Sequence, residues 1–145
     1  MAFSILVEGV TYIGSFKNHL HDVTGDIYTI DGIDNQIQIR RFTYDGAGKD
    51  TFFWAGNEGK EPNSEKGFVL EYPYKGRSYF YAKPDIPNLP EFEGNEQPIV
   101  LTLPDGRKAK DLKWLSVWDR TWSSSYGDMI WPKNDMIKTI VDLFA

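Results

Sequence analysis

The chain has 145 residues, of which 41% are hydrophobic and 26% charged, which is the length of one domain and the composition of a soluble globular protein. Its 16 lysines and arginines stand against 21 aspartates and glutamates without forming a basic run, so nucleic acid is not expected as a partner. Because there is no cysteine, disulfides, thiolate catalysis and iron–sulfur clusters are excluded. The apolar run 3–7 is too short for a membrane span and lacks the basic flank of a signal peptide, so we expect no membrane insertion.

The first half of the chain predicts a series of strands. Residues 10–16 and 25–30 are rich in β-branched and aromatic residues, and the second of these segments ends at an Asp-Gly turn. Residues 36–40 alternate with period two, which places Ile37 and Ile39 on one face of a half-buried strand. The same criteria predict strands at 51–55, 68–72 and 78–82.

The second half begins with four prolines between residues 84 and 98, which predict a long irregular loop. Residues 99–103 then resume a strand pattern. The turn residues at 104–107 favour a hairpin between that strand and the segment 111–119. Large residues fall on both faces of 112–118, which is typical of a central strand covered on both sides.

Only the tail has helical spacing, with apolar side chains at Met136, Ile137, Ile140, Val141 and Phe144 after a capping Asn134. The prediction is therefore an all-β fold: a single antiparallel β-sandwich or barrel-like domain with a short C-terminal helix. We expect one domain over 1–145, consisting of a β domain over 10–132 and a helical tail over 133–145.

Four blocks occur in an order that is hard to obtain by chance. They are Phe-Thr-Tyr-Asp-Gly-Ala-Gly at 42–48, Phe-Trp-Ala-Gly at 53–56, Leu-Pro-Asp-Gly at 103–106 and Lys-Trp-Leu-Ser-Val-Trp-Asp at 113–119. With a Gly-Ser-Phe block at 14–16, His21 to Gly25 and a closing Tyr-Gly at 126–127, the chain resembles the Skeletor-type (DM-thirteen) domain family over about residues 10–132.

The resemblance implies an all-β domain that occurs mostly in secreted or membrane-tethered proteins, so we expect an extracellular or secreted location. It also implies electron transfer, which has been proposed for the family because of a cysteine in its Val-Trp-Cys strand. In this chain Asp119 stands at that position. A carboxylate neither passes through thiol oxidation states nor supplies a soft ligand to haem iron or copper.

The only two histidines, His19 and His21, are two residues apart on an extended segment. That spacing can chelate zinc or copper if Asp22 or Asp26 supplies a third ligand. The alternative is that His21 packs and hydrogen-bonds locally while His19 is solvated, and this is the interpretation we adopt.

Two carboxylates, Asp45 and Asp50, lie close together in a glycine-rich segment beside Tyr44. They could hold calcium through oxygen ligands, but two aspartates fall far short of the 6–8 oxygens that calcium prefers. Turn chemistry, in which each carboxylate accepts backbone N–H groups, is the expected role.

Tryptophans gather near the C-terminal end of the β region, where Trp114, Trp118, Trp122 and Trp131 could stack on sugar rings or a planar cofactor. Core packing is the default for tryptophan in a strand, with Trp122 expected to be exposed. For Asp119 and Arg120, an ion pair or an exposed strand end is expected rather than a general base.

These observations favour a non-enzymatic binding or assembly module without a cofactor or metal, whose partner is the extracellular matrix or another protein. One alternative is an electron-transfer domain that holds haem or copper. The other is a calcium- or carbohydrate-dependent matrix-binding module. The candidate ligand-binding residues are His21, Tyr44, Asp45, Asp50, Trp118, Asp119 and Arg120.

Overall fold

The structure is a computed structural model that describes residues 9–70, 72 and 88–133. Within these residues the chain forms ten strands and one 3-10 turn. They are β1 (Val10–Ser15), β2 (Lys17–Asn18), β3 (Thr24–Ile30), β4 (Ile33–Tyr44), β5 (Thr51–Gly56), β6 (Gly67–Leu70), β7 (Phe92–Glu93), β8 (Ile99–Thr102), η1 (Ala109–Asp111), β9 (Trp114–Asp119) and β10 (Ser124–Ile130).

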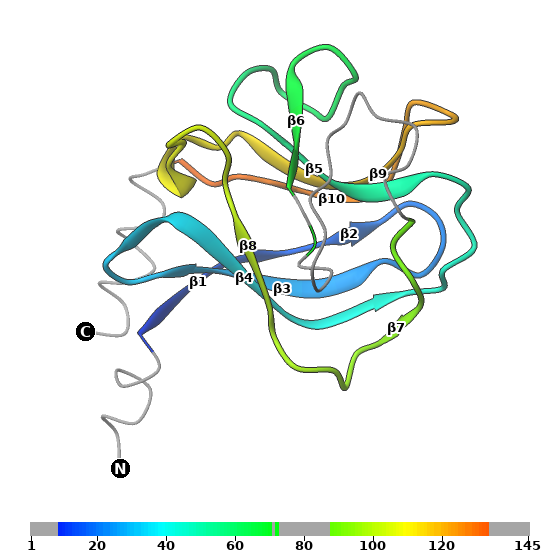
Figure 1. The fold of residues 1–145 in the computed structure, drawn as a ribbon, viewed down its shortest axis with the longest axis horizontal. Coiled ribbons are helices and arrows are strands. Elements are labelled where there is room, and N and C mark those ends of the chain that lie inside the picture. The colour runs from blue at the N-terminus through cyan, green and yellow to red at the C-terminus, as the bar shows by residue number, and fades with distance from the viewer. Residues whose placement is uncertain (1–8, 71, 73–87, 134–145) are drawn as a thin grey trace.

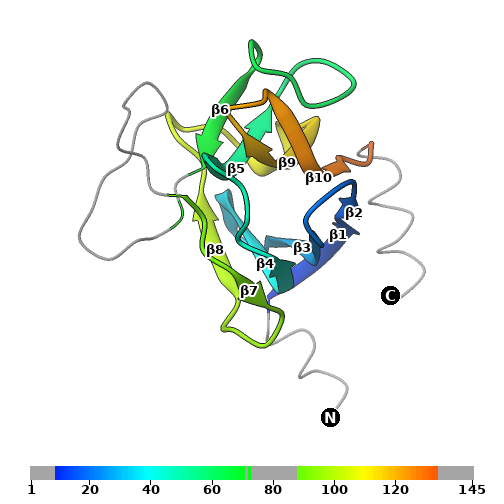
Figure 2. The same cartoon turned by 90° about the vertical axis from the view of Figure 1, so that its right-hand side faces the viewer.

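The strands form two antiparallel sheets that face each other across the core (Figure 1 and Figure 2). One sheet has the order β1-β3-β4-β7, with β8 also paired to β4, and the other has the order β2-β10-β9-β5-β6. The expected all-β class is therefore confirmed. The two sheets stay open, so the arrangement is a sandwich and not a closed barrel.

In the first sheet, β4 is the longest strand and extends past the predicted end at Arg40. Ile37 and Ile39 are buried as their alternation predicts. At Arg41 the backbone has a φ of 54°, which turns the strand so that Phe42 and Tyr44 also point into the core. The extension delivers Tyr44 and the residues after it to one end of the sandwich.

In the second sheet, β9 lies between β5 and β10, and all six of its residues are buried, as predicted for a central strand. Its outer face packs Trp114 and Trp118 with Phe52 and Trp54 in an aromatic cluster separate from the main core. The ring of Trp114 lies so close over Gly56 that a Cβ there would be 2.2 Å from it. A glycine at the end of β5 is therefore required by packing.

The expected hairpin between 99–103 and 111–119 is wrong. β8 pairs with β4 in one sheet, whereas β9 pairs with β5 and β10 in the other, and the turn with η1 carries the chain between the sheets. The physical reason is burial. β8 hides only alternate residues, which suits the face of one sheet, whereas β9 needs cover on both faces and finds it only at the centre of the other sheet.

Several expectations concern other segments. The strand expected at 68–72 is observed as β6, and β10 was not predicted. The strand at 78–82, the first part of the proline-rich loop and the helix after Asn134 lie outside the described residues. No helix in the described part of the chain is long and apolar enough to cross a membrane.

Candidate functional site

The last residue of β9, Asp119, points into the core and has no exposed surface. Its Oδ2 accepts a hydrogen bond of 2.6 Å from the Tyr126 hydroxyl and one of 3.0 Å from the Lys49 backbone N–H. Its Oδ1 accepts a bond of 2.7 Å from the Thr121 N–H. The carboxylate thus joins β9, the start of β10 and the segment before β5.

These donors decide the charge of the buried group. Burial alone would raise the pKa of Asp119, but the hydrogen bonds from Tyr126 and from backbone N–H groups outweigh it, so the pKa lies below the usual value. For Tyr126, burial and the bond to Asp119 both raise the pKa of the phenol. At neutral pH the site therefore holds an ionised carboxylate and a protonated tyrosine.

Gly48 closes the site on one side. Its N–H donates to the Tyr44 hydroxyl oxygen at 2.8 Å, and a Cβ at this position would lie 2.0 Å from Thr51 Oγ1. No larger residue fits there without displacing the cluster. Tyr44 is itself buried, which raises the pKa of its phenol.

His21 lies at the rim of the site in a left-handed backbone conformation with a φ of 69°. Its ring centroid is 4.4 Å from that of Tyr126, and its Nδ1 lies 2.9 Å from Asp45 Oδ2. Asp45 Oδ1 accepts a hydrogen bond from the Ala47 N–H. Burial of Asp45 is outweighed by these two bonds, so its pKa is lowered. His21 and Asp45 therefore fix each other through local contacts.

The other candidate ligands also have protein partners. Asp50 accepts a hydrogen bond from Nε of Arg120, and His19 Nε2 lies 2.9 Å from Asp128 Oδ2. The described residues contain no group of three or more histidine, aspartate or glutamate side chains arranged to hold a metal ion.

The tryptophans lie in three different places. Trp54, Trp114 and Trp118 pack on the outer face of the second sheet, Trp131 packs in the main core, and Trp122 lies in the turn between β9 and β10. Trp118 lies on the face of β9 opposite to Asp119 and stacks on Trp54, with ring centroids 6.5 Å apart. It is therefore not part of the Asp119 cluster. Trp122, in the turn between β9 and β10, is 62% exposed, and the Lys49 ammonium lies 5.7 Å from its ring centroid.

The structure thus brings His21, Tyr44, Asp45 and Asp119 together, with the Asp50–Arg120 pair beside them. The central partner that sequence reasoning missed is Tyr126, because β10 was not identified as a strand. The signal was available in the polar residues around the turn 120–123, which joins two segments of similar length. Pairing those segments would have placed Tyr126 close to Asp119.

Replacing Tyr126 by phenylalanine tests the role of the buried hydrogen bond. Tyr126→Phe removes a donor from an ionised, fully buried carboxylate, so the free energy of unfolding should fall by about 1.5–3 kcal/mol in urea titrations. Tyr12→Phe, which removes the hydroxyl of a half-exposed tyrosine that contacts Ser15, should stay within about 0.5 kcal/mol. Equal losses in the two variants would contradict a special role for Tyr126.

The lowered pKa of Asp119 predicts a pH dependence of stability. Because the folded-state pKa is depressed, the stabilising contribution is complete above the usual pKa and is lost as pH falls through the folded value, below about pH 4. The stability advantage of the native chain over Asp119→Asn should therefore shrink between about pH 5 and pH 2. Asp105→Asn, at an exposed turn, should follow the native pH profile, and an advantage over Asp119→Asn that does not change with pH would refute the assignment.

Comparison with known proteins agrees with this architecture. The DM13 family, described as "Electron transfer DM13", matches residues 15–130. Protein Skeletor of Drosophila melanogaster is 29% identical over 124 residues in its isoforms B/C and D/E, which covers 86% of this chain. The chain spans only 14% and 7% of the length of these two relatives. No solved structure matches.

The match covers most of the chain, including the strands that carry Tyr44, Asp119 and Tyr126. The chain belongs to the DM13 family.

Proposed function

We propose that this DM13 domain is a non-enzymatic, secreted binding module that contacts an extracellular protein or matrix polymer through the loops at one end of the sandwich. The observation that carries the proposal is the exposure of two large apolar side chains there, Trp122 at 62% and Leu20 at 54%. Leu20 lies in the loop 19–23 and Trp122 in the loop 120–123. These two loops and the loop 45–50 lie together at one end of the sandwich, and we call them the loop platform (right-hand end in Figure 1).

Hydrogen bonds between the loops hold the platform together. The Asp45 N–H donates to the His21 carbonyl at 3.0 Å, and the Arg120 N–H donates to the Asp50 carbonyl at 3.0 Å. The buried Asp119 holds the Lys49 N–H from below. Binding would therefore order few additional groups, which lowers the entropic cost of association.

The chemistry of the platform supports recognition over catalysis. Tryptophan is enriched among the residues that dominate binding energy, and loops on a rigid scaffold commonly carry binding sites. The carboxylate of Asp119 has donors on both oxygens and no exposed surface, so it is not positioned to take a proton from a substrate.

Variants at the platform test the proposal. The native chain, Trp122→Ala and Val100→Ala should be compared for binding to immobilised extracellular matrix proteins and glycans. Val100 is an exposed apolar residue in β8, outside the platform. We expect Trp122→Ala to weaken binding at least about tenfold without changing the melting temperature, and Val100→Ala to bind normally. Equal binding by all three proteins would refute the platform as the contact surface.

Electron transfer is the second candidate, because it is how the matching family is described. In this chain, we infer, Asp119 occupies the position of the family's redox cysteine, and its oxygens are already engaged by Tyr126, Thr121 and Lys49. This donor set stabilises a carboxylate, so it does not fit a haem or copper centre built on residue 119. His19 and His21 each place one ring nitrogen against a carboxylate.

Spectroscopy separates the two candidates. If the chain is a binding module, titration with haem or copper should give no Soret band and no reversible voltammetric wave. Asp119→Cys should gain a titratable thiol and lose stability, because the donors around residue 119 would then face a weaker acceptor. Haem binding by the native chain that is abolished in His21→Ala would restore electron transfer as the leading function.

A further inference from the structure

Two hollows adjoin at the end of the sandwich opposite to the loop platform. The first has a volume of about 250 Å³ and the second about 350 Å³. Both are lined by Trp131, which follows β10, and by Lys110 of η1. A single elongated molecule could therefore contact both hollows.

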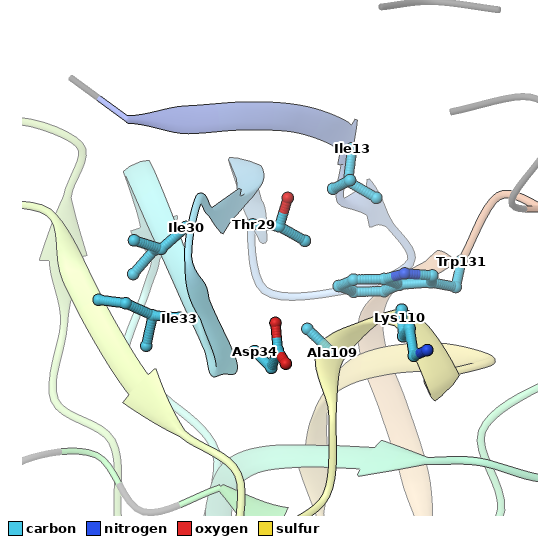
Figure 3. A pocket seen from close by; sticks show the side chains of 8 residues that line it. All are labelled: Ile13, Thr29, Ile30, Ile33, Asp34, Ala109, Lys110 and Trp131. Carbon is cyan, nitrogen blue, oxygen red and sulfur yellow. The ribbon is translucent and has the colours of Figure 1, made fainter. Parts of the chain in front are cut away.

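The first hollow is mainly apolar. Ile13, Ile30 and Ile33, from three strands of one sheet, line it together with Ala109 and Trp131. Figure 3 shows Ile13 pointing toward the indole ring of Trp131, whereas Ile30 and Ile33 lie at the far side of the lining, beyond Thr29 and Asp34. Its volume exceeds the roughly 150 Å³ of a cavity that takes up benzene. The indole N–H of Trp131 is buried and has no hydrogen-bond partner among the described residues. The hollow therefore offers mainly apolar surface to a ligand.

The second hollow is basic. Its lining includes Lys60, Lys110, Lys113 and Lys133 over a floor that contains Ile130 and Pro132, and includes no aspartate or glutamate. None of these lysines has an ion-pair partner in the described part of the chain. Four lysines that have no counter-charge among the described residues, in a chain with a net charge of -5, form a local site for an anion.

The backbone around this basic hollow is held in place. The Trp114 indole N–H donates to the Glu58 carbonyl at 2.9 Å, which fixes the loop that carries Lys60. The Trp131 N–H donates to the Lys113 carbonyl at 2.9 Å, which ties the segment before Lys133 to the start of β9. The backbone segments that carry Lys60, Lys113 and Lys133 are therefore tied to the second sheet.

We propose that the two hollows bind one amphiphilic anion, with its apolar tail among the isoleucines and its charged head between the lysines. Lys110 lies at the junction and can reach the head, whereas the carboxylate of Asp34 lines the apolar hollow and repels an anionic head from that side. Burial of the tail and charge-assisted hydrogen bonds to the head both favour binding. This site is separate from the loop platform, so either proposal can fail alone.

Binding of sodium decanoate to the full chain, measured by calorimetry at concentrations where decanoate is monomeric, tests the site. We expect saturable binding of one molecule. Lys110→Glu and Ile33→Asp should each weaken it about tenfold or more, because one removes the charge at the junction and the other places a charge in the apolar hollow. Lys17→Glu, the matched charge reversal on β2, should bind as the native chain does. Lys133→Glu, a second charge reversal at the basic hollow, should weaken binding as Lys110→Glu does.

The probes separate the two contributions. Decanol, which lacks the charge, and inorganic sulfate, which lacks the tail, should each bind at least about tenfold more weakly than decanoate. Equal affinity of decanol or sulfate, or equal losses in Lys17→Glu and Lys110→Glu, would overturn the proposal. Binding to phosphatidylglycerol vesicles without binding to dissolved decanoate would assign the lysines to a membrane surface instead. A dimer that dissociates in Lys110→Glu would assign the hollows to a second copy of the chain.

Discussion

The ionised carboxylate of Asp119 is the constraint around which one end of the molecule is arranged. A charge with no exposed surface is tolerated only if polar groups surround it, and here they come from three different segments: the Tyr126 hydroxyl, the Thr121 N–H and the Lys49 N–H. Each donor fixes a different piece of chain. The loops that follow β4 and β9 and the strand β10 are therefore coupled through one side chain.

This coupling explains why the two ends of the sandwich differ. At the Asp119 end, the loops are tied to a buried polar centre, so their exposed residues, such as Trp122, sit on a rigid base. At the opposite end, Trp131 and Lys110 line two hollows, one of them with isoleucines and the other with lysines. The crossing of the chain from β8 through η1 to β9 supplies Lys110 to that end.

Period-two alternation and two-sided burial were enough to predict most of the strands from sequence, because they report which faces of a segment avoid water. Pairing was not predictable in the same way. The Pro-Asp-Gly turn after β8 carries the geometry of a tight turn, with a φ of 57° at Asp105, but only the demand of β9 for cover on both faces decides that the chain changes sheet. Asp119 could be identified from sequence as a candidate site residue, whereas its partner Tyr126 could be identified only once β10 was known to pair with β9.

The environment of Asp119 shows that the chemistry possible at residue 119 depends on the residues that donate hydrogen bonds to it as well as on its own side chain. The donors that converge on residue 119 are the Tyr126 hydroxyl, the Thr121 and Lys49 N–H groups and, at 3.5 Å, the Thr51 hydroxyl, and together they match an acceptor with two charged oxygens. A thiol, which is a weak acceptor, would leave some of them unsatisfied in the core. A domain that carries a redox group at this position would therefore need different neighbours at Tyr126 and around Gly48. The hydrogen-bond donors around residue 119 are therefore as informative about function as the residue itself, because they determine which charged group can be buried there.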